Sequence, residues 1–404
     1  MKLLILSCNT GGGHNSAAAA IRSRFEAAGH HCRVVNTLDF LPKATAELIS
    51  KGHDFAYRHI PLIYGAGYRY EEKHASVPFY EQTLRGADGL REYLSDHPAD
   101  LVICVHVFSA MMMTELRHNW GLLLPTYFVA TDYTCSPGVS DLDVDGFLIP
   151  HSRLVDEFTA AGIPVGKLYV TGIPVKEEFT RRESRDEARD TLGLPREGRL
   201  VLLATGSMGC GPIRTTSLRM ERVLGENDRL VVICGKNKRL YRDLTFLFFQ
   251  NSRVKIVGYT DKMHLYMRAS DVLVTKAGGL STTEAVAAGV PLLYLNAVPG
   301  CESRNIEFMA RRFTASSAAG RPSSRSMIRN LFIFSPLVIK NSEIKEPRPP
   351  RRPALGHRTA APGATARPKW AVFCGRQPRS HHPWPTAPPQ GPFPGAPQPG
   401  GGCW

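Results

Sequence analysis

The sequence predicts an α/β protein built from two doubly wound, Rossmann-like domains that face each other across a cleft. Three observations indicate this fold. Short apolar runs alternate with segments of helical character, the runs are apolar throughout instead of at every second residue, and the whole series occurs twice along the chain. Continuous apolar runs are typical of parallel strands that helices cover on both faces. The length of 404 residues is sufficient for two or three domains.

The first series predicts an amino-terminal domain over residues 1–172. A helical insertion at about 36–99 is expected to interrupt it, because that stretch does not follow the alternation. A helix is expected at 15–28, and strands are expected at 3–8, 32–35, 101–105, 126–130 and 147–149.

The second series predicts a domain over residues 173–312, after a connection rich in Pro, Gly and charged residues at 171–179. A glycine loop at 205–211 and a helix at 213–224 follow its first strand. Loops at the carboxyl ends of such strands form the ligand crevice. The strands of this domain are expected at 200–204, 230–234, 254–257, 271–275 and 291–295.

The net charge of +14 comes from the last quarter of the chain. Residues 311–404 contain 15 Lys and Arg against 2 Asp and Glu, whereas residues 1–310 contain 35 against 34. This distribution excludes a uniformly basic nucleic-acid binder, and we expect no specific nucleic-acid partner. The Pro- and Arg-rich segment 313–404 cannot bury enough apolar surface to fold, so we expect disorder from about residue 315. A shifted reading frame is the simplest explanation of such a segment.

No apolar run reaches the roughly 18 to 20 residues that a membrane helix requires. The first residues, MKLLILSCNT, are too short for a secretory signal and suit a first strand. The nine cysteines form no CxxC pair, and we expect those of the two domains to be reduced core residues. We therefore expect a cytoplasmic protein.

The loop NTGGGH at 9–14 follows a strand and opens a helix, so its backbone can approach a phosphate at the positive end of that helix. It lacks the Gly-Lys-Ser/Thr of a Walker loop and meets the GxGxxG dinucleotide pattern only loosely. The alternative is a tight turn with no ligand. His14 in this loop is a candidate general base, and a capping or solvent-facing histidine is its alternative.

Two more polar residues end strands of the same domain. His106 follows LVICV and is an acceptor-side candidate, and Asp132 follows TYFVA. Asp132 could orient a base or hold an acceptor hydroxyl, or it could cap the next turn. We expect both to face the same crevice as His14.

The densest group in the second domain is TKAGGLSTTE at 275–284. Gly278 and Gly279 would expose N–H groups at a helix start, and Glu284 lies one turn into that helix. Ser281 and Glu284 also match a capping box, which is the structural alternative. Gly206 and Ser207, in the other glycine loop, are expected to support the same phosphates. The acidic DLDVD at 141–145 suits a surface turn, and no metal site is expected.

NTGGGH, VATDYTCSPGV and TKAGGLSTTE followed by PGCESRN resemble the family of bacterial diacylglycerol glucosyltransferases and plant monogalactosyldiacylglycerol synthases. The resemblance covers about residues 1–310. It implies the two-domain GT-B architecture, related to the peptidoglycan GlcNAc transferase that makes lipid II. It also implies transfer of a hexose from a UDP-sugar to diacylglycerol, with inversion and without a bound metal.

The resemblance also implies roles for individual residues. Glu284 would bind the uridine ribose, Gly278, Gly279 and Ser281 the diphosphate, Gly12, Gly13 and His14 the reaction centre, and Glu302 and Asn305 the donor sugar. Cys301 departs from the family, which usually has Gln there, and the likeness ends near Phe308. The insertion at 36–99 resembles an acceptor and membrane-docking region, and a plain helical covering of the core is its alternative.

The expected function is therefore an inverting glycosyltransferase on the inner face of the cell membrane, peripheral and without a cofactor. Its partners would be UDP-glucose or UDP-galactose, diacylglycerol and an anionic membrane surface. A lipid-linked GlcNAc transferase of cell-wall synthesis and a truncated, noncatalytic nucleotide-sugar binder are alternatives. A nucleic-acid or membrane binder driven by the basic tail is a third.

Overall fold

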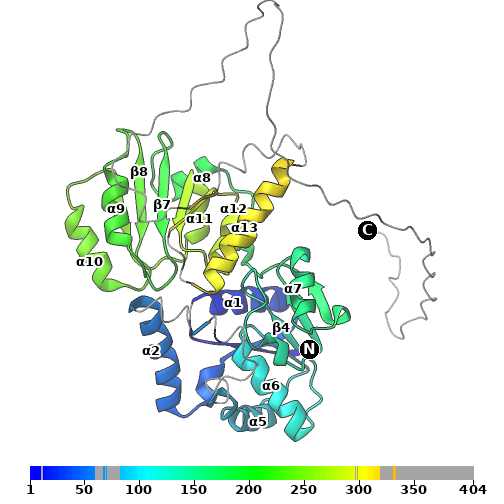
Figure 1. Ribbon diagram of the computed structural model, residues 1–404. Helices are drawn as coiled ribbons and strands as arrows, with labels where there is room; N and C mark the ends of the chain where they lie inside the picture. The colour runs from blue at the N-terminus through cyan, green and yellow to red at the C-terminus, as the bar shows by residue number, and fades with distance from the viewer. Residues whose placement is uncertain are drawn as a thin grey trace, which may run out of the picture. The chain divides into compact units, whose positions relative to one another are not determined.

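The computed structural model describes residues 1–10, 12–59, 67–68, 70, 82–295, 297, 299–318 and 331–333 (Figure 1). Two sheets of parallel strands, each flanked by helices, form within them. This confirms the predicted pair of doubly wound α/β domains. The prediction came from the strands: in β1 (Lys2–Ser7), for example, five of six residues are buried, as expected between two layers of helices.

The first sheet has the strand order β2-β1-β3-β4-β5-β6, and all its pairings are parallel. The edge strand β6 was not predicted: its residues LYV are apolar or aromatic, but the run is only three residues long and is partly or fully exposed. Besides β1, the strands are β2 (His31–Asn36), β3 (Leu101–Cys104), β4 (Thr126–Val129), β5 (Gly146–Ile149) and β6 (Leu168–Val170).

Helices of the first domain connect and cover these strands. They are α1 (Gly12–Ala27), α2 (Lys43–His59), α5 (Ala87–Asp96), α6 (Val107–Trp120) and α7 (Val155–Ala160). The expected insertion at 36–99 contains the 3-10 helix η1 (Thr37–Phe40), α2 and α5. Most of its aromatic and basic stretch, 59–74, lies outside the described residues.

The second sheet has the strand order β12-β11-β10-β7-β8-β9, again with parallel pairings. Its strands are β7 (Leu200–Ala204), β8 (Arg229–Ile233), β9 (Val254–Val257), β10 (Val272–Thr275), β11 (Leu292–Tyr294) and β12 (Leu331–Ile333). Its helices are α8 (Arg185–Thr191), α9 (Ile213–Glu221), α10 (Lys238–Leu247), α11 (Met263–Ala269), α12 (Gly279–Ala288) and α13 (Cys301–Ala318). In the part of the chain described, no helix is long and apolar enough to cross a membrane.

The expectation of disorder from about residue 315 concerns a segment that lies mostly outside the described residues. Helix α13 continues to Ala318, and β12 pairs in parallel with β11 inside the basic segment. Leu331, Phe332 and Ile333 are aromatic or branched apolar residues of the kind enriched in strands, and the edge of β11 offers backbone groups to pair with. The rest of the segment 313–404 lies outside the described residues.

The cysteines that the structure describes are free thiols, as expected for reduced core residues. Cys8 and Cys104 are fully buried at the carboxyl ends of β1 and β3. Burial raises the pKa of each thiol to about 12, because the thiolate would lose its hydration. Both therefore act as small apolar residues of the core.

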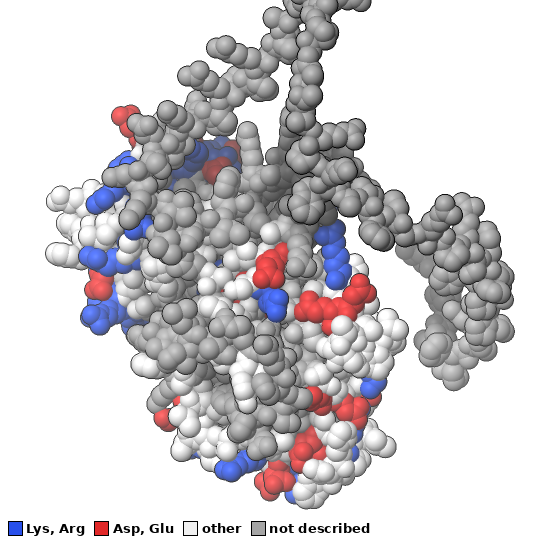
Figure 2. All heavy atoms as spheres, in the orientation of Figure 1, with Lys and Arg blue, Asp and Glu red and all other residues white. Residues whose placement is uncertain are grey.

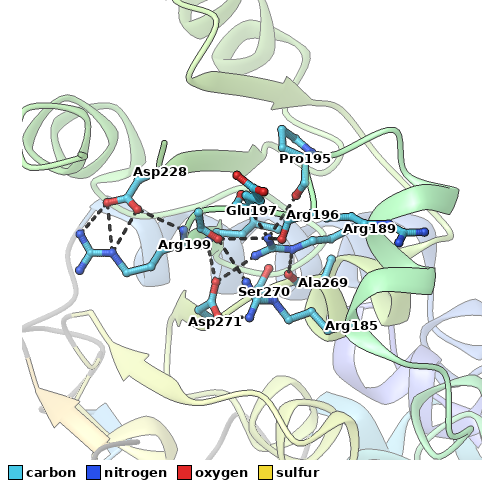
Figure 3. Close-up of polar contacts among 12 residues, drawn as sticks. Arg185, Arg189, Pro195, Arg196, Glu197, Arg199, Asp228, Ala269, Ser270 and Asp271 are labelled. Atoms are coloured by element: carbon cyan, nitrogen blue, oxygen red, sulfur yellow. Dashed lines mark hydrogen bonds and ion pairs between the residues drawn. The ribbon is translucent and has the colours of Figure 1, made fainter. Parts of the chain in front are cut away.

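Arg189, near the end of α8, anchors the amino-terminal ends of two strands of the second sheet (Figure 3). These ends lie opposite to the carboxyl ends from which the ligand-binding loops are expected. Its side chain is 1% exposed and donates hydrogen bonds to carbonyl oxygens in the turn 195–198, to the carbonyl of Ala269 and to the Asp271 carboxylate. Asp271 also accepts from the backbone N–H of Leu200 at 2.7 Å. One guanidinium thus ties α8 to the starts of β7 and β10, and this anchors the strands whose opposite ends carry the site.

Candidate functional site

The carboxyl ends of both sheets line one cavity of about 750 Å³. The first domain contributes the loops after β1, β3 and β4, and the second contributes the loops after β7, β8 and β10. Residues of α2 and the first turn of α13 also line it. This is the edge at which parallel α/β sheets bind ligands, and the volume suits a nucleotide-sized molecule.

The two glycine loops predicted to bind phosphate meet across this cavity. A Cβ atom on Gly12 would lie 2.1 Å from the hydroxyl oxygen of Ser207, so only glycine fits at position 12 without movement. In the facing loop, Gly206 has a φ of +88°, which favours glycine. Gly13 also lines the cavity. The loop contact brings the start of α1 against the second domain.

His14 lies in the first turn of α1, and the structure fixes the position of its ring. Its Nδ1 lies 2.8 Å from the carbonyl oxygen of Val105 and 3.3 Å from the hydroxyl of Thr131. Because a carbonyl only accepts, Nδ1 carries the proton in the neutral ring. Nε2 is then the basic nitrogen. This tautomer is the one that a general base requires.

His106 lies beside His14, with ring centroids 4.6 Å apart and the rings nearly perpendicular. It is the N-cap residue of α6: its Nδ1 accepts from the backbone N–H of Phe108 at 3.1 Å. Its Nε2 lies 3.3 Å from the Thr10 hydroxyl. The neutral His106 ring therefore carries its proton on Nε2, opposite to the arrangement in His14.

Asp132 lines the same cavity as the two histidines, but its carboxylate is directed to the second domain. Its Oδ1 accepts from the backbone N–H of Gly279 at 3.2 Å and from the side-chain amide of Asn305 at 2.7 Å. Burial raises the pKa of Asp132, and these two donors partly offset that rise. The described groups that orient His14 are the Val105 carbonyl and Thr131.

Helix α12 begins at the second-domain glycines, with its N-terminus at the cavity. Its N-cap residue is Gly278 and has no side-chain capping bond, so the capping-box interpretation of Ser281 and Glu284 is wrong. Both side chains line the cavity instead. Burial raises the pKa of Glu284 to about 7, and the Lys176 ammonium opposes that rise. At neutral pH this carboxyl can both donate and accept hydrogen bonds.

Glu302 and Asn305 in the first turns of α13 are almost completely buried. Glu302 lines the cavity and pairs with Lys276 at 3.1 Å. The Asn305 amide donates to Asp132 and to the carbonyl of Ala277 at 2.8 Å, while its oxygen accepts from the backbone N–H of Tyr133 at 2.7 Å. The structure thus gives Asn305 three protein partners at the junction of the domains.

The sequence analysis assigned no role to two lysines that line the cavity, Lys276 and Lys176. The Lys276 side chain lies near both glycine loops: its Cε would be 3.5 Å from a Cβ on Gly206 and 3.9 Å from one on Gly278. The available signal was its position directly after an apolar strand and before a glycine pair. Among the described residues, no group of three or more His, Cys, Asp or Glu is arranged to hold a metal ion.

Cys301, at the first position of α13, lines the cavity beside Tyr68 of the insertion. Its thiol donates to the Tyr68 hydroxyl at 3.3 Å. Burial raises the pKa of the thiol to about 12, so it stays neutral. The residue that departs from the family pattern is thus a neutral thiol at the cavity wall.

Two family matches cover the two sheets in turn. Residues 14–175 match the monogalactosyldiacylglycerol (MGDG) synthase family, and residues 200–297 match the glycosyltransferase family 28 C-terminal domain. The chain thus resembles glycosyltransferases in both domains, and it is a transferase. The first matched range contains His14 and the second contains the whole of helix α12. Each of the two matched domains of the transferase therefore contributes residues to the cavity.

Characterised relatives resemble the transferase over most of its length. A processive diacylglycerol beta-glucosyltransferase of Bacillus cereus (strain G9842) is 27% identical over 322 residues, which is 78% of this chain and 81% of the relative. An enzyme of the same name from Staphylococcus saprophyticus is 26% identical over 316 residues, covering 77% and 79%. The transferase is thus similar to glycolipid-forming enzymes along both domains.

Solved structures share the fold of the transferase at low sequence identity. Acinetobacter baumannii MurG has a TM-score of 0.50 and 12% identity, covering 82% of this chain and 96% of its own. The glycotransferase of kitacinnamycin has a TM-score of 0.53 and 13% identity, covering 84% and 87%. These likenesses support the predicted GT-B architecture.

Proposed function

We propose that this glycosyltransferase moves a hexose from a UDP-sugar to the free hydroxyl of diacylglycerol, with inversion at the anomeric carbon. The observation that carries the proposal is His14: a ring held by a backbone carbonyl through Nδ1, in a cavity shared with the N-terminus of α12. The similarity to diacylglycerol glucosyltransferases supports the acceptor.

In the proposed reaction the acceptor hydroxyl gives its proton to Nε2 of His14. Its oxygen forms a bond to the anomeric carbon as the bond from that carbon to the diphosphate breaks, and UDP leaves with the bonding electrons. One displacement from the side opposite to UDP inverts the centre. A positioned base of this type contributes roughly 10²- to 10⁴-fold to the rate.

The leaving diphosphate would be bound by the second domain. The N-terminus of α12 presents backbone N–H groups and the positive end of the helix dipole. Lys276, which pairs with Glu302, brings its ammonium group near Gly206 and Gly278. Fixed dipoles and a cation can stabilise the departing anion without a metal ion. Glu284, half-buried and able to donate and accept, suits the two ribose hydroxyls.

The proposal predicts specific products from the purified full chain. Labelled UDP-glucose or UDP-galactose, mixed with diacylglycerol in anionic vesicles, should give a labelled hexosyl-diacylglycerol. NMR of the product should show a β-linkage formed from the α-linked donor. An α-linked product would exclude a single displacement.

Glu284→Gln should weaken UDP binding measured by calorimetry and leave the unfolding midpoint near that of the native chain at pH 5.

Binding of UDP by the native chain without turnover on any lipid would instead favour the noncatalytic nucleotide-sugar binder. Transfer of GlcNAc to a lipid-linked acceptor alone would favour the cell-wall enzyme. We place the reaction at the cytoplasmic face of the membrane, where UDP-sugars and the lipid acceptor meet.

A further inference from the structure

Helix α10 (Lys238–Leu247) presents large aromatic side chains to solvent. Phe246 is 87% exposed and Phe249, just past the helix end, is 81% exposed. Side chains of this size are normally buried. Neighbouring aromatic side chains that are exposed to solvent therefore indicate a surface that binds a partner. Leu244 and Phe248 of the same segment are buried in the core of the second domain. The helix is therefore already anchored on one side, and the exposed aromatics occupy the other.

Basic residues lie on the same face of α10 as the exposed aromatics. Arg239, Arg242, Phe246 and Phe249 follow each other at intervals of three and four residues, which places them in one row along the helix. Lys238 and Tyr241 are exposed as well. We call this set the α10 surface, and it consists of Lys238, Arg239, Tyr241, Arg242, Phe246 and Phe249.

The charge of the α10 surface is positive. The acidic residue in α10 is Asp243, which pairs with Arg239 at 4.0 Å. In Figure 2, Lys and Arg side chains lie along the left-hand edge, with uncharged and some acidic side chains among them, where Figure 1 shows α9 and α10. Cations combined with exposed aromatics complement a surface that is anionic outside and apolar beneath.

The α10 surface begins at the rim of the cavity. Gly235, three residues before α10, lines the cavity, and so does Tyr259, which is 65% exposed. The ammonium of Lys236 lies 5.7 Å from the centre of the Tyr259 ring. A surface bound along α10 would therefore lie next to the opening through which substrates reach His14.

We propose that the α10 surface docks on an anionic lipid bilayer. Phe246 and Phe249 enter the boundary between head groups and acyl chains, and Lys238, Arg239 and Arg242 pair with lipid phosphates. The choice of a bilayer over another anionic partner rests on the lipid acceptor of the proposed function. The surface gives the second domain a membrane contact of its own, separate from the one expected for the insertion at 36–99.

The direct test places a fluorescent reporter at the surface. Phe246→Trp in the full chain is mixed with phosphatidylglycerol vesicles that carry brominated acyl chains, which quench tryptophan on contact. Leu123→Trp, at a site 87% exposed in the first domain, is the matched control. The added tryptophan at 246 should be quenched and the one at 123 should not. Equal signals from both variants would overturn the proposal, whatever the basic tail contributes to binding.

A second test measures partition into the same vesicles. Arg242→Gln should weaken it roughly fivefold, since one basic residue near an anionic surface contributes about that factor; Arg153→Gln, an exposed arginine of the first domain, should not. Phe246→Ser with Phe249→Ser should weaken it further and leave turnover of detergent-dispersed diacylglycerol unchanged. Unchanged partition of these variants into vesicles would refute docking on a bilayer. Variants that no longer form a dimer but still bind vesicles would refute it as well. Because both tests measure binding, they stand apart from failure of the proposed reaction.

Discussion

At the scale of single residues, the geometry of His14 fits the proton-accepting role that we propose for it. The Val105 carbonyl and the Thr131 hydroxyl hold the ring through Nδ1, and His106 packs against its face. The Val105 carbonyl at 2.8 Å selects the tautomer with the proton on Nδ1, which the proposed role as a base requires. The role as base therefore rests on Nε2.

His14→Gln tests that role. Glutamine can still donate to the Val105 carbonyl, but it cannot take up a proton, so transfer should fall by roughly 100-fold or more. UDP affinity, measured by calorimetry, should stay near that of the native chain. Transfer at an unchanged rate would remove His14 from the mechanism.

Glu284 gives a prediction about pH. Its folded pKa, about 7, lies above the ordinary value of 4.5, so the folded chain holds this proton more tightly than the unfolded chain. The contribution to stability is then lost as pH rises from about 4.5 through 7. Glu284→Gln should be more stable than the native chain at pH 8, by up to about 3 kcal/mol, and equal to it near pH 4. Urea unfolding at both pH values measures this, and an identical difference at both would contradict the shift.

The sequence identified cavity residues well where position along a strand decides them. His14, His106 and Asp132 each follow a strand, and parallel strands bring such positions to one edge, where the structure has them. Contacts between the domains could not be predicted in this way. The partners of Asn305 lie up to 173 positions away, and the pairing of Lys276 with Glu302 depends on how α13 enters the cleft.

At the scale of elements, the meeting of the two glycine loops is a steric condition. In Gly12→Ala the new methyl group would lie 2.1 Å from the Ser207 hydroxyl and 3.0 Å from its Cβ, so the hydroxyl must rotate away and the loops must shift slightly. We expect transfer to fall by roughly 10- to 100-fold, since a displacement of about 1 Å at a reaction centre can cost that much.

The clash can be tested by removing its other half. Ser207→Gly in the same chain should restore most of the activity lost in Gly12→Ala, measured as initial rates of transfer. Gly166→Ala is the control, because a Cβ there meets no atom within 4 Å. Failure of the second change to rescue would mean that Gly12 is needed for its backbone and not for space.

Element boundaries followed the apolar pattern wherever burial was complete. The strands β7 and β8, buried over most of their length, were predicted to within one residue. The three-residue strand β6 was missed, and α12 starts at the glycine pair as expected, with Gly278 as its N-cap and not Ser281, the structural alternative. Local chemistry alone does not distinguish these alternatives, since the deciding contacts come from other parts of the chain.

At the scale of the whole molecule, Asn305 joins the domains. It donates to Asp132, accepts from the backbone of Tyr133 and anchors to the Ala277 carbonyl. The Tyr133 hydroxyl also bonds Thr283 at 2.9 Å, and its ring stacks on Phe308 at 4.9 Å. The relative position of the two domains that form the cavity walls therefore depends on the buried amide of Asn305 and on the contacts of Tyr133.

Asn305→Ala should destabilise the chain by about 2–4 kcal/mol, because it leaves buried groups on both domains without partners. It should also slow transfer more than it weakens UDP binding. Thermal unfolding and steady-state kinetics measure the two effects, with the exposed Asn119→Ala as the matched control. A loss of stability no larger than that of the control would show that the junction does not depend on this amide.

The bond between Asp132 and the Gly279 N–H has a consequence for substrate exchange. A carboxyl oxygen of the chain itself, on Asp132, already accepts from the N–H donor at the start of α12. A diphosphate that uses this N–H must displace the carboxylate on arrival, and the carboxylate can reclaim the N–H when the product departs. In the proposed reaction, the affinity for UDP would then reflect competition between the diphosphate and the Asp132 carboxyl group for one donor. Such competition keeps the product from binding too tightly, and release can keep pace with repeated turnover.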